Sequence, residues 1–430
     1  MSSNNFREIN SCEVCGNSKL ESVLDLGLHS MCDDLVTIGD TRICNEYPIE
    51  ILFCKTCNTA HQRFQVPKEE LFPSTYHYRS RFTKDVLNGM TDLVNSCLRR
   101  FGNFSNKKVI DIGCNDGSLL DFFRKRGAIT IGIEPTGAYL DAKLKNHIVY
   151  NSFLSEELSD LIIKEHGRPD LITFTNVFAH IEDLQEVLRS LKKLISEGTI
   201  IVIENHYLGS VLNGNQFDTF YHEHPRTYSY SSFLKMASVL NMELIDVEFP
   251  SRYGGNIRVF FGNKLYTKCT MNVDLIALES REREFFDDFS LLRKNLKYWL
   301  KSKRKQLQSE FERHGKIRAK AFPGRAAILV KLLGLDEDLI SAVYEKPGSL
   351  KIGCYLPGTR VPIYSDNELF SMTDKTTPIL NLAWHLSSEI SNYLAENSYS
   401  CQIIDILDPK DFLDKNLSYK NRTINDYKGL

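Results

Sequence analysis

The stretch from Lys107 to Glu134 constrains the fold most, because a strand, a glycine turn, a helix and a second strand follow one another in it. Lys107-Lys-Val-Ile-Asp-Ile-Gly113 is a short apolar run, and a helical pattern follows from Ser118 to Arg126. The second apolar run, Ala128–Ile133, leads into Glu134, about 20 residues beyond the glycines, where an acid can accept from both hydroxyls of a ribose. The glycine turn lets backbone N–H groups approach a ligand. The segment therefore predicts an α/β domain that binds a nucleoside.

The turn itself indicates which nucleoside is bound. A nicotinamide enzyme would show G-x-G-x-x-G, whereas Asp111-Ile-Gly-Cys-Asn-Asp-Gly117 has one early and one late glycine with polar side chains between them, a pattern that favours S-adenosylmethionine. Two later predicted strands, 169–175 and 198–204, are expected to deliver polar residues to the same sheet edge, where ligands bind in open α/β sheets. The residues expected to bind the cofactor are Asp111, Gly113, Asn115, Asp116, Glu134, Asn176, Ala179 and His180.

Two C-x-x-C pairs near the N-terminus predict a metal site. Cys12 and Cys15 form one pair, and Cys54 and Cys57 form the other. Two such turns complete a closed four-sulfur shell, which is how structural zinc is held. Four unrelated buried thiols and a redox dithiol are the alternatives. The chain has eleven cysteines and no export signal, which favours reduced thiols over a disulfide framework.

The segment Asp218-Thr-Phe-Tyr-His-Glu-His224 concentrates groups that transfer protons at neutral pH. Taken alone, it is compatible with a base cluster, a metal site or a hydrogen-bonded structural patch. Its position after the nucleoside-binding unit favours the base cluster. His222 is interpreted as a hydrogen-bonded surface residue. His180 and His206 are expected near the cofactor, where they shape the pocket.

Composition and charge narrow the class of function. The 430 residues are 42% hydrophobic and 25% charged, which is typical of a globular chain of two or three domains. A formal net charge of -2, from 53 basic and 55 acidic side chains, offers no field for nucleic acid or an anionic membrane. The N-terminus lacks the apolar core of a signal peptide, and no long uncharged apolar run occurs. We therefore expect a cytoplasmic protein with no membrane or nucleic-acid partner.

The ordered set of motifs resembles the sugar C-methyltransferase family, S-adenosylmethionine-dependent enzymes that methylate a carbon of nucleotide-linked keto-deoxysugars. The resemblance covers most of the chain and implies an N-terminal zinc-binding domain, a class I (Rossmann-like) methyltransferase core and a C-terminal α/β domain for the substrate nucleotide. It is carried by the four cysteines, Asp111–Leu120, Asn176–His180, Asn215–His224, Tyr253-Gly-Gly-Asn-Ile-Arg258 and Leu356–Ile363.

Roles for individual residues follow from this resemblance and from the chemistry. A carbon next to a ketone becomes nucleophilic only after a base removes its proton. His224 is the expected base, Glu223 is expected to orient or polarise its imidazole, and Tyr221 and Tyr76 are expected to offer hydroxyls to the enolate oxygen or the sugar. The residues expected to bind the substrate are Tyr78, Asn205, His222, Tyr253, Gly254, Arg325 and Glu345.

The expected domains are 1–75 for zinc, 76–270 for methyl transfer, 271–320 as a helical connector and 321–430 for the nucleotide. Ala319-Lys-Ala-Phe-Pro-Gly-Arg-Ala-Ala327 departs from the glycine-rich turn of many family members, so Arg325 is expected to contact the diphosphate in place of backbone amides. The alternative activity is O-methylation of a small molecule or a sugar hydroxyl. We expect a monomer, with a homodimer as the alternative. The sequence leaves open the nucleotide, the sugar, methylation at C3 or C5, and the downstream product.

Overall fold

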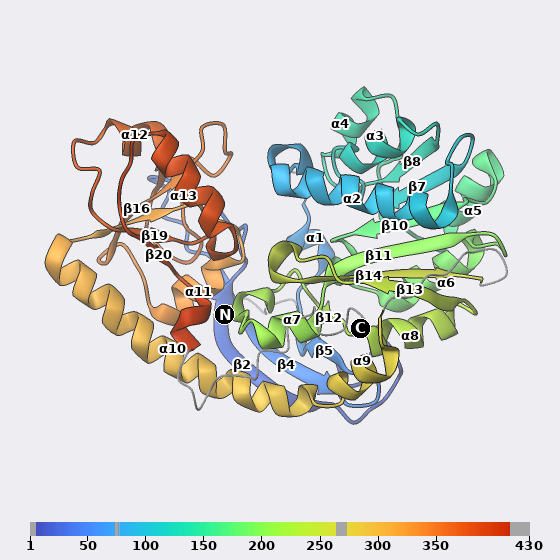
Figure 1. Cartoon of the computed structure of the whole chain (residues 1–430), viewed down its shortest axis with the longest axis horizontal. Helices are drawn as coiled ribbons and strands as arrows, with labels where there is room; N and C mark the ends of the chain where they lie inside the picture. The colour runs from blue at the N-terminus through green and yellow to red at the C-terminus, as the bar shows by residue number, and fades with distance from the viewer. Residues whose placement is uncertain (1–5, 74–75, 77, 264–272, 413–430) are drawn as a thin grey trace.

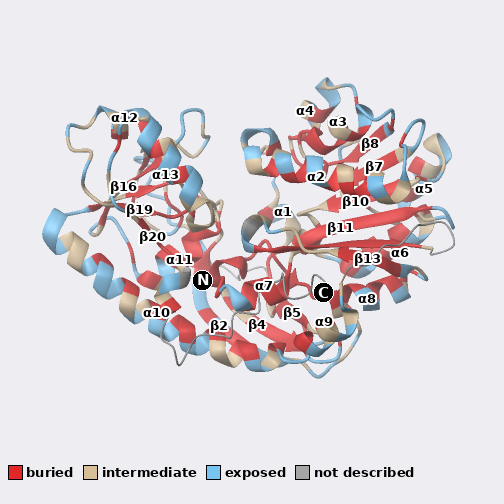
Figure 2. Ribbon diagram, in the orientation of Figure 1, coloured by how far each residue is buried: buried red, intermediate tan, exposed pale blue. Residues whose placement is uncertain are grey.

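The computed structural model describes residues 6–73, 76, 78–263 and 273–412, which fold into three sheet-based parts joined by a long helix (Figure 1). The central part holds a seven-stranded sheet, the N-terminal part a four-stranded sheet, and the C-terminal part a five-stranded sheet. Strands of all three sheets are largely buried, whereas the outer faces of the covering helices are exposed (Figure 2).

The central sheet has the strand order β13-β14-β11-β10-β7-β8-β9. All neighbours pair in parallel except β14, which is antiparallel to both β11 and β13. The chain moves outward from β7 in one direction and returns to β10 on the other side, so the crevice between their carboxyl ends is a switch point for ligand binding. The strands are β7 (Lys108–Ile112), β8 (Ile129–Ile133), β9 (Ile148–Tyr150), β10 (Leu171–Thr175), β11 (Ile200–His206), β13 (Glu243–Glu248) and β14 (Asn256–Gly262).

Helices cover both faces of this sheet because alternate strand residues point to opposite sides. Val109 packs in a cluster with α2 and α3, whereas its neighbour Ile110 packs in a cluster with α5, α6 and α8. Asp183 caps α6 by accepting from the Glu186 N–H at 2.9 Å. The helices are α2 (Lys84–Phe101), α3 (Ser118–Arg124), α4 (Tyr139–Leu144), α5 (Glu156–His166), α6 (Leu184–Leu194), α7 (Leu208–Asn213) and α8 (Tyr230–Val239).

The N-terminal sheet is completed by a strand from the central part of the chain. Its order is β12-β5-β4-β2, with β2 (Glu21–Ser30), β4 (Glu46–Cys54), β5 (Thr59–Gln62) and β12 (Arg226–Thr227). β12 begins two residues after His224 and pairs antiparallel with β5. The segment that holds His224 is therefore fixed between two sheets. The remaining short N-terminal elements are β1 (Arg7–Glu8), β3 (Val36–Thr37), β6 (Phe64–Gln65) and α1 (Lys68–Leu71).

Two helices lie in the range expected for the connector: α9 (Leu275–Glu282) and the 30-residue α10 (Phe285–His314). α10 runs along the N-terminal sheet and reaches the C-terminal part (Figure 1). Lys303 of α10 stands in a run of basic residues, which is typical of a solvated helix face. It is nevertheless buried: its Nζ lies 3.0 Å from the Asp411 Oδ1 and donates to the Asp405 carbonyl oxygen.

The C-terminal sheet is a smaller parallel sheet with its own switch point. Its order is β18-β16-β15-β19-β20, and it begins at Ile317, inside the range expected for the connector. β17 pairs with β3 and so ties this part to the N-terminal part. The elements are β15 (Ile317–Lys320), α11 (Ala326–Leu333), β16 (Ile340–Glu345), β17 (Cys354–Tyr355), β18 (Ile363–Ser365), α12 (Asp366–Ser371), β19 (Ile379–Asn381), α13 (Ser387–Glu396) and β20 (Ile403–Asp405).

Candidate active site

The four predicted metal-binding cysteines lie together. The sulfur atoms of Cys12, Cys15, Cys54 and Cys57 lie within 4.8 Å of one another, with Cys12 to Cys57 at 3.4 Å and Cys15 to Cys54 at 3.6 Å. A tetrahedral zinc ion with Zn–S bonds of about 2.3 Å would space its sulfurs by about 3.8 Å, so the cluster fits zinc. Four thiolates fill the coordination shell and leave no position for a reactant, which makes the site structural.

The turn after β7 is shaped to bring backbone atoms close to a ligand. Gly113, Asn115 and Gly117 all have positive φ, at 70°, 50° and 73°. A Cβ atom at Gly113 would lie 2.6 Å from a side-chain carbon of Val177, so only glycine fits there. The Asn115 N–H donates to the Glu134 Oε2 at 2.9 Å, which links the turn to the end of β8.

Two predicted cofactor residues of this turn bond mainly within the framework. Asp111 is buried in β7 and accepts from the Thr173 hydroxyl at 2.7 Å, and burial raises the pKa of its carboxyl to about 7. Asp116 is fully buried and accepts from the N–H and hydroxyl of Ser118 and from the N–H of Arg81. Their contacts fix the strand and the start of α3, and direct binding of the cofactor by either residue stays a prediction.

The side chain of Asn115 holds a second segment over the turn. Its Oδ1 accepts from the Ser80 N–H at 3.0 Å, and its Nδ2 donates to the Tyr78 carbonyl at 3.1 Å. This contact brings the segment that holds Tyr76 and the exposed Tyr78, both predicted site residues, to the turn at the carboxyl end of β7.

Polar residues at the ends of β10 and β11 meet at the same edge. Asn176 follows β10 with φ 55°, and its Oδ1 accepts from the Asn256 Nδ2 at 3.2 Å. Ala179 and His180 follow in a short 3-10 turn, where Ala179 is buried. Asn205 in β11 is 1% exposed, and within the described ranges neither atom of its amide has a hydrogen-bond partner. A buried amide of this kind fits an interaction with a bound ligand.

Three imidazoles converge at this edge, and we call His180, His206 and His224 the histidine cluster. The His224 ring centroid lies 4.8 Å from that of His180, 5.2 Å from that of His206 and 4.2 Å from the Tyr221 ring. The His224 Nδ1 lies 3.0 Å from the Thr219 carbonyl oxygen. Because a carbonyl only accepts, Nδ1 carries the proton and Nε2 keeps its lone pair. Burial, with the neighbouring imidazoles, holds the pKa of His224 well below its usual value, so the ring is neutral at pH 7.

The structure corrects the expected role of Glu223 as the group that orients His224. Residues Tyr221 to His224 form a turn in which the His224 N–H donates to the Tyr221 carbonyl at 2.8 Å. The carbonyl of Thr219, and not the Glu223 carboxyl, receives the imidazole proton. The Glu223 backbone carbonyl instead accepts from the His180 Nδ1 at 2.7 Å.

The Glu223 carboxyl faces a different set of groups. Burial and the neighbouring carboxyl of Asp33 raise its pKa well above the usual value, whereas Lys351 acts in the opposite direction. Burial and Glu223 also raise the pKa values of the Tyr76 and Tyr221 phenols, so both stay protonated donors. Asp33 was missed from the sequence, because a single acid in a loop after β2 carries no motif.

His222 is buried, which corrects its interpretation as a surface residue. Its Nε2 lies 3.1 Å from the Tyr47 carbonyl oxygen, and its ring packs edge-on against the Tyr47 ring at 5.8 Å. These contacts attach the turn to β4 of the N-terminal sheet. A direct role of His222 in substrate binding stays a prediction.

The predicted substrate residues of the C-terminal part follow the first two strands of its sheet. The Glu345 Oε1, at the end of β16, accepts from the Phe322 N–H at 2.6 Å. Arg325 is only 8% exposed, and its Nε lies 3.0 Å from the Asp218 Oδ2. The guanidinium therefore points into the histidine cluster, which was not foreseen from the sequence. Gly254 has φ 81°, and its carbonyl oxygen accepts a hydrogen bond from the Gln216 Nε2 at 2.8 Å. The side chain of Tyr253 lies outside the described residues.

Comparisons with known proteins agree with this three-part architecture. A putative zinc binding domain matches residues 12–72, a methyltransferase domain matches 82–247, and a C-methyltransferase C-terminal domain matches 251–401. The C-methyltransferase NovU of Streptomyces niveus is 26% identical over 402 residues, which cover 89% of this chain and 92% of NovU. The chain belongs to the C-methyltransferase family. It is an S-adenosylmethionine-dependent C-methyltransferase with a zinc-binding N-terminal domain.

Other matches cover a smaller share of this C-methyltransferase. The ubiquinone biosynthesis O-methyltransferase of Acinetobacter baumannii (strain AYE) is 28% identical over 27% of this chain and 48% of its own length. The magnesium protoporphyrin IX methyltransferase of Synechocystis PCC 6803 with bound SAH is 15% identical, with a TM-score of 0.34, over 42% of this chain and 84% of that chain. Among the described residues, no helix is long and apolar enough to cross a membrane.

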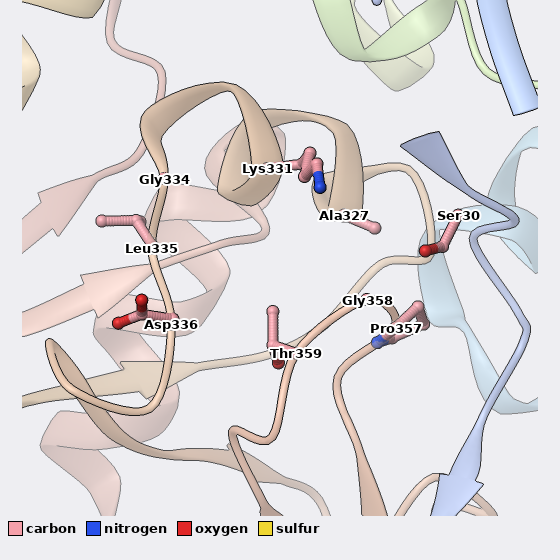
Figure 3. Close-up of a pocket in the computed structure, with 9 residues that line it drawn as sticks. All are labelled: Ser30, Ala327, Lys331, Gly334, Leu335, Asp336, Pro357, Gly358 and Thr359. Atoms are coloured by element: carbon pink, nitrogen blue, oxygen red, sulfur yellow. The ribbon is translucent and has the colours of Figure 1, made fainter. Parts of the chain in front are cut away.

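A separate cavity of about 220 Å³ lies between the N-terminal and C-terminal domains of the C-methyltransferase (Figure 3). Ser30, Lys331, Asp336 and Thr359 are among the residues that line it, and Lys331 forms an ion pair with Glu46 at 2.6 Å. None of the lining residues is a predicted site residue, so the cavity is distinct from the edge that carries the histidine cluster.

Proposed function

We propose that this C-methyltransferase methylates the carbon next to the ketone, C3, of a nucleotide-linked 4-keto-deoxysugar. The observation that carries the proposal is the state of His224. The Nδ1 of His224 donates its proton to the Thr219 carbonyl, and the Nε2 of the neutral ring keeps a free lone pair in a buried site. A neutral buried base is what removal of a proton next to a ketone requires, since a nearby methyl donor reacts only with the resulting enolate.

The reaction proceeds in two steps. The His224 Nε2 takes the proton from C3, the C–H electron pair forms the C3–C4 double bond, and the ketone oxygen becomes an enolate. S-adenosylmethionine, when bound, would supply an electrophilic methyl group: C3 would bond to that carbon as the methyl–sulfur bond breaks, S-adenosylhomocysteine would leave, and the ketone would be restored. The protonated phenols of the half-buried Tyr221 and Tyr76 donate hydrogen bonds to the sugar oxygens. The buried amide of Asn205, which has no hydrogen-bond partner among the described residues, supplies a further contact. His224 then releases its proton to solvent.

The C-terminal domain is the proposed holder of the substrate nucleotide. Its parallel sheet has a switch point between β15 and β19, and the Phe322–Arg325 turn and Glu345 lie at the carboxyl ends of its first two strands. The near-neutral charge of the chain supports recognition of one small anionic substrate rather than of nucleic acid. We propose that the enzyme acts as a monomer, because all three domains contribute to one site within one chain.

The deciding experiment is mass spectrometry after incubation with S-adenosylmethionine and a panel of nucleotide-linked 4-keto-6-deoxysugars in deuterated water. We expect one sugar to gain a methyl group and to exchange deuterium at C3. His224→Ala should lower both rates by about 100- to 10,000-fold, the usual contribution of a general base, and should leave cofactor affinity unchanged. His29→Ala is the matched control, because His29 is also buried and also bonds a backbone carbonyl through one ring nitrogen.

Two results would count against the proposal. If His224→Ala exchanged and methylated at the wild-type rate, the base would be another residue. If the protein bound S-adenosylmethionine and no sugar gained mass, the sugar assignment would fail, and O-methylation of a small molecule would become the leading function.

A further inference from the structure

Arg325 reaches from the C-terminal domain into the active site. It follows the Pro323-Gly324 turn and directly precedes α11, yet its guanidinium lies beside residues of the central domain. The Nη1 lies 3.4 Å from the Thr219 Oγ1 and 3.5 Å from the His206 Nε2. Arg325 therefore places a permanent positive charge at the histidine cluster.

Two residues hold this guanidinium in position. The Asp218 Oδ2 lies 3.0 Å from the Arg325 Nε and accepts from the Trp384 Nε1 at 2.9 Å. The Arg325 Cζ lies 5.3 Å from the Trp384 ring centroid, which is within cation–π range. Asp218 is fully buried, so its carboxylate and the guanidinium each depend on the other for charge compensation.

These contacts do not satisfy all of the N–H donors of the guanidinium. In the part of the chain that the structure describes, the Arg325 Nη2 has no hydrogen-bond partner. A guanidinium carries five N–H donors, and a buried donor without an acceptor is costly, so an anionic oxygen at this position would be strongly held. At the ketone of the sugar, such an oxygen arises only while the proton is on the base.

Asp218 and its neighbour Thr219 connect Arg325 to the base. Asp218 and Thr219 are adjacent in a short 3-10 turn. Their side chains contact the guanidinium, while the Thr219 backbone carbonyl holds the His224 Nδ1 at 3.0 Å. One rigid turn therefore sets the position of the base relative to the positive charge.

Building on the proposed function, we infer that Arg325 is the group that stabilises the enolate oxygen, with Asp218 and Trp384 as positioning residues. When His224 removes the C3 proton, the ketone π electrons move to oxygen, and the Arg325 N–H groups donate to that charge. The charge returns to carbon as the new C–C bond forms, so the arginine contributes to both steps. Docking of the C-terminal domain thus supplies a catalytic group as well as a nucleotide site.

Deuterium uptake at C3 without S-adenosylmethionine tests this inference on the full chain. The probe is the nucleotide-linked 4-keto-6-deoxysugar that gains mass in the panel. Arg325→Gln should lower exchange and the kcat of methylation by about 100- to 1,000-fold, the usual effect of losing an oxyanion donor, with KM within about threefold. Arg325→Lys should recover part of the rate, because lysine restores the positive charge but lacks the planar pair of N–H donors of a guanidinium.

Matched variants separate this role from structural effects. The double variant Arg325→Gln with Asp218→Asn avoids a buried unpaired carboxylate and should show the same loss of exchange. Asp218→Asn alone should lower exchange by about 10-fold, since it leaves the guanidinium present but loosely placed. Arg318→Gln removes another arginine–aspartate pair of the same domain, with Asp374 at 3.1 Å, and should leave exchange unchanged.

Different failures have different meanings. Wild-type exchange in the double variant would overturn the role of Arg325 and leave the proposed function intact. An unchanged kcat with a KM raised at least about 10-fold would show that Arg325 binds the ground-state substrate, such as its diphosphate. If no sugar exchanged or gained mass with the wild-type protein, the proposed function and this inference would fall together.

Discussion

The central and C-terminal domains of this C-methyltransferase both end their first parallel strand in a turn that leads to a helix, but the two turns are built differently. After β7, three residues of the turn have positive φ, and at one of them, Gly113, a Cβ atom would overlap the side chain of Val177. After β15, Ala321 has positive φ, and the side chain of Arg325 extends into the neighbouring domain. The first turn brings backbone N–H groups close to a ligand, whereas the second places the positive charge of Arg325 in the neighbouring domain.

Both turns are nevertheless fixed by the same device. An acid at the end of the second strand accepts from a backbone N–H of the turn: Glu134 from Asn115 at 2.9 Å, and Glu345 from Phe322 at 2.6 Å. The shared contact shows that a parallel α/β unit fixes its first turn independently of what the turn binds. The difference in function lies in the other residues of the two turns.

The largest expected contrast is between alanine substitutions in the two turns. Gly113→Ala places a Cβ 2.6 Å from Val177 at φ 70°, so left-handed strain and overpacking together should cost about 4 kcal/mol and abolish measurable cofactor binding. Gly324→Ala places its Cβ 3.3 Å from the Asp33 Oδ1 at an ordinary φ and should cost less than about 1 kcal/mol. Urea unfolding and calorimetric titration with S-adenosylmethionine measure both effects. Equal losses in the two variants would show that the turns do not differ as described.

The central domain was largely predictable from sequence because its signals are local. The strand, glycine turn and helix at 107–126 follow one another in the chain, and the cysteine pairs have a spacing that only a shared ion explains well. His224 could be found because titratable residues gather around it in sequence.

The contacts between domains could not be predicted in this way. Arg325 pairs with Asp218, which lies more than 100 residues earlier in the sequence, and Asp33 approaches Glu223 from another domain. The Pro-Gly-Arg turn was interpreted by comparison with glycine-rich turns that bind phosphate, so the side chain was assigned to the nearest expected ligand. His222 was interpreted as a surface residue, whereas it lies in a turn that its contacts with the Tyr47 carbonyl and ring attach to the N-terminal sheet.

The next contrast concerns the strands that precede the turns. Burial raises the pKa of Asp111 in β7 to about 7, above its unfolded value, so the folded ligand-free protein binds one proton more than the unfolded chain in the window between the two values. The stability contributed by this proton is present below about pH 4 and is lost as pH rises, by roughly 1 kcal/mol per pH unit up to about pH 7. Asp111→Asn should remove this dependence while keeping the Thr173 contact.

Urea unfolding at several pH values, compared between the wild-type protein and Asp111→Asn, measures that slope. Parallel stability curves for the wild-type protein and the variant would show that Asp111 is already ionised in the folded state.

The smallest effect is expected at Ala321, whose φ of 59° opens the second turn. An L-residue pays about 1–2 kcal/mol for this conformation, whereas glycine adopts it freely but loses more chain entropy on folding. Ala321→Gly should therefore raise the free energy of unfolding by about 0.5 kcal/mol. Ala395→Gly, in the exposed face of α13, is the matched control and should lower it by about 0.5–1 kcal/mol. A loss at both positions would mean that the second turn relaxes its backbone, and that its shape is set by the Arg325–Asp218 pair rather than by a fixed left-handed residue.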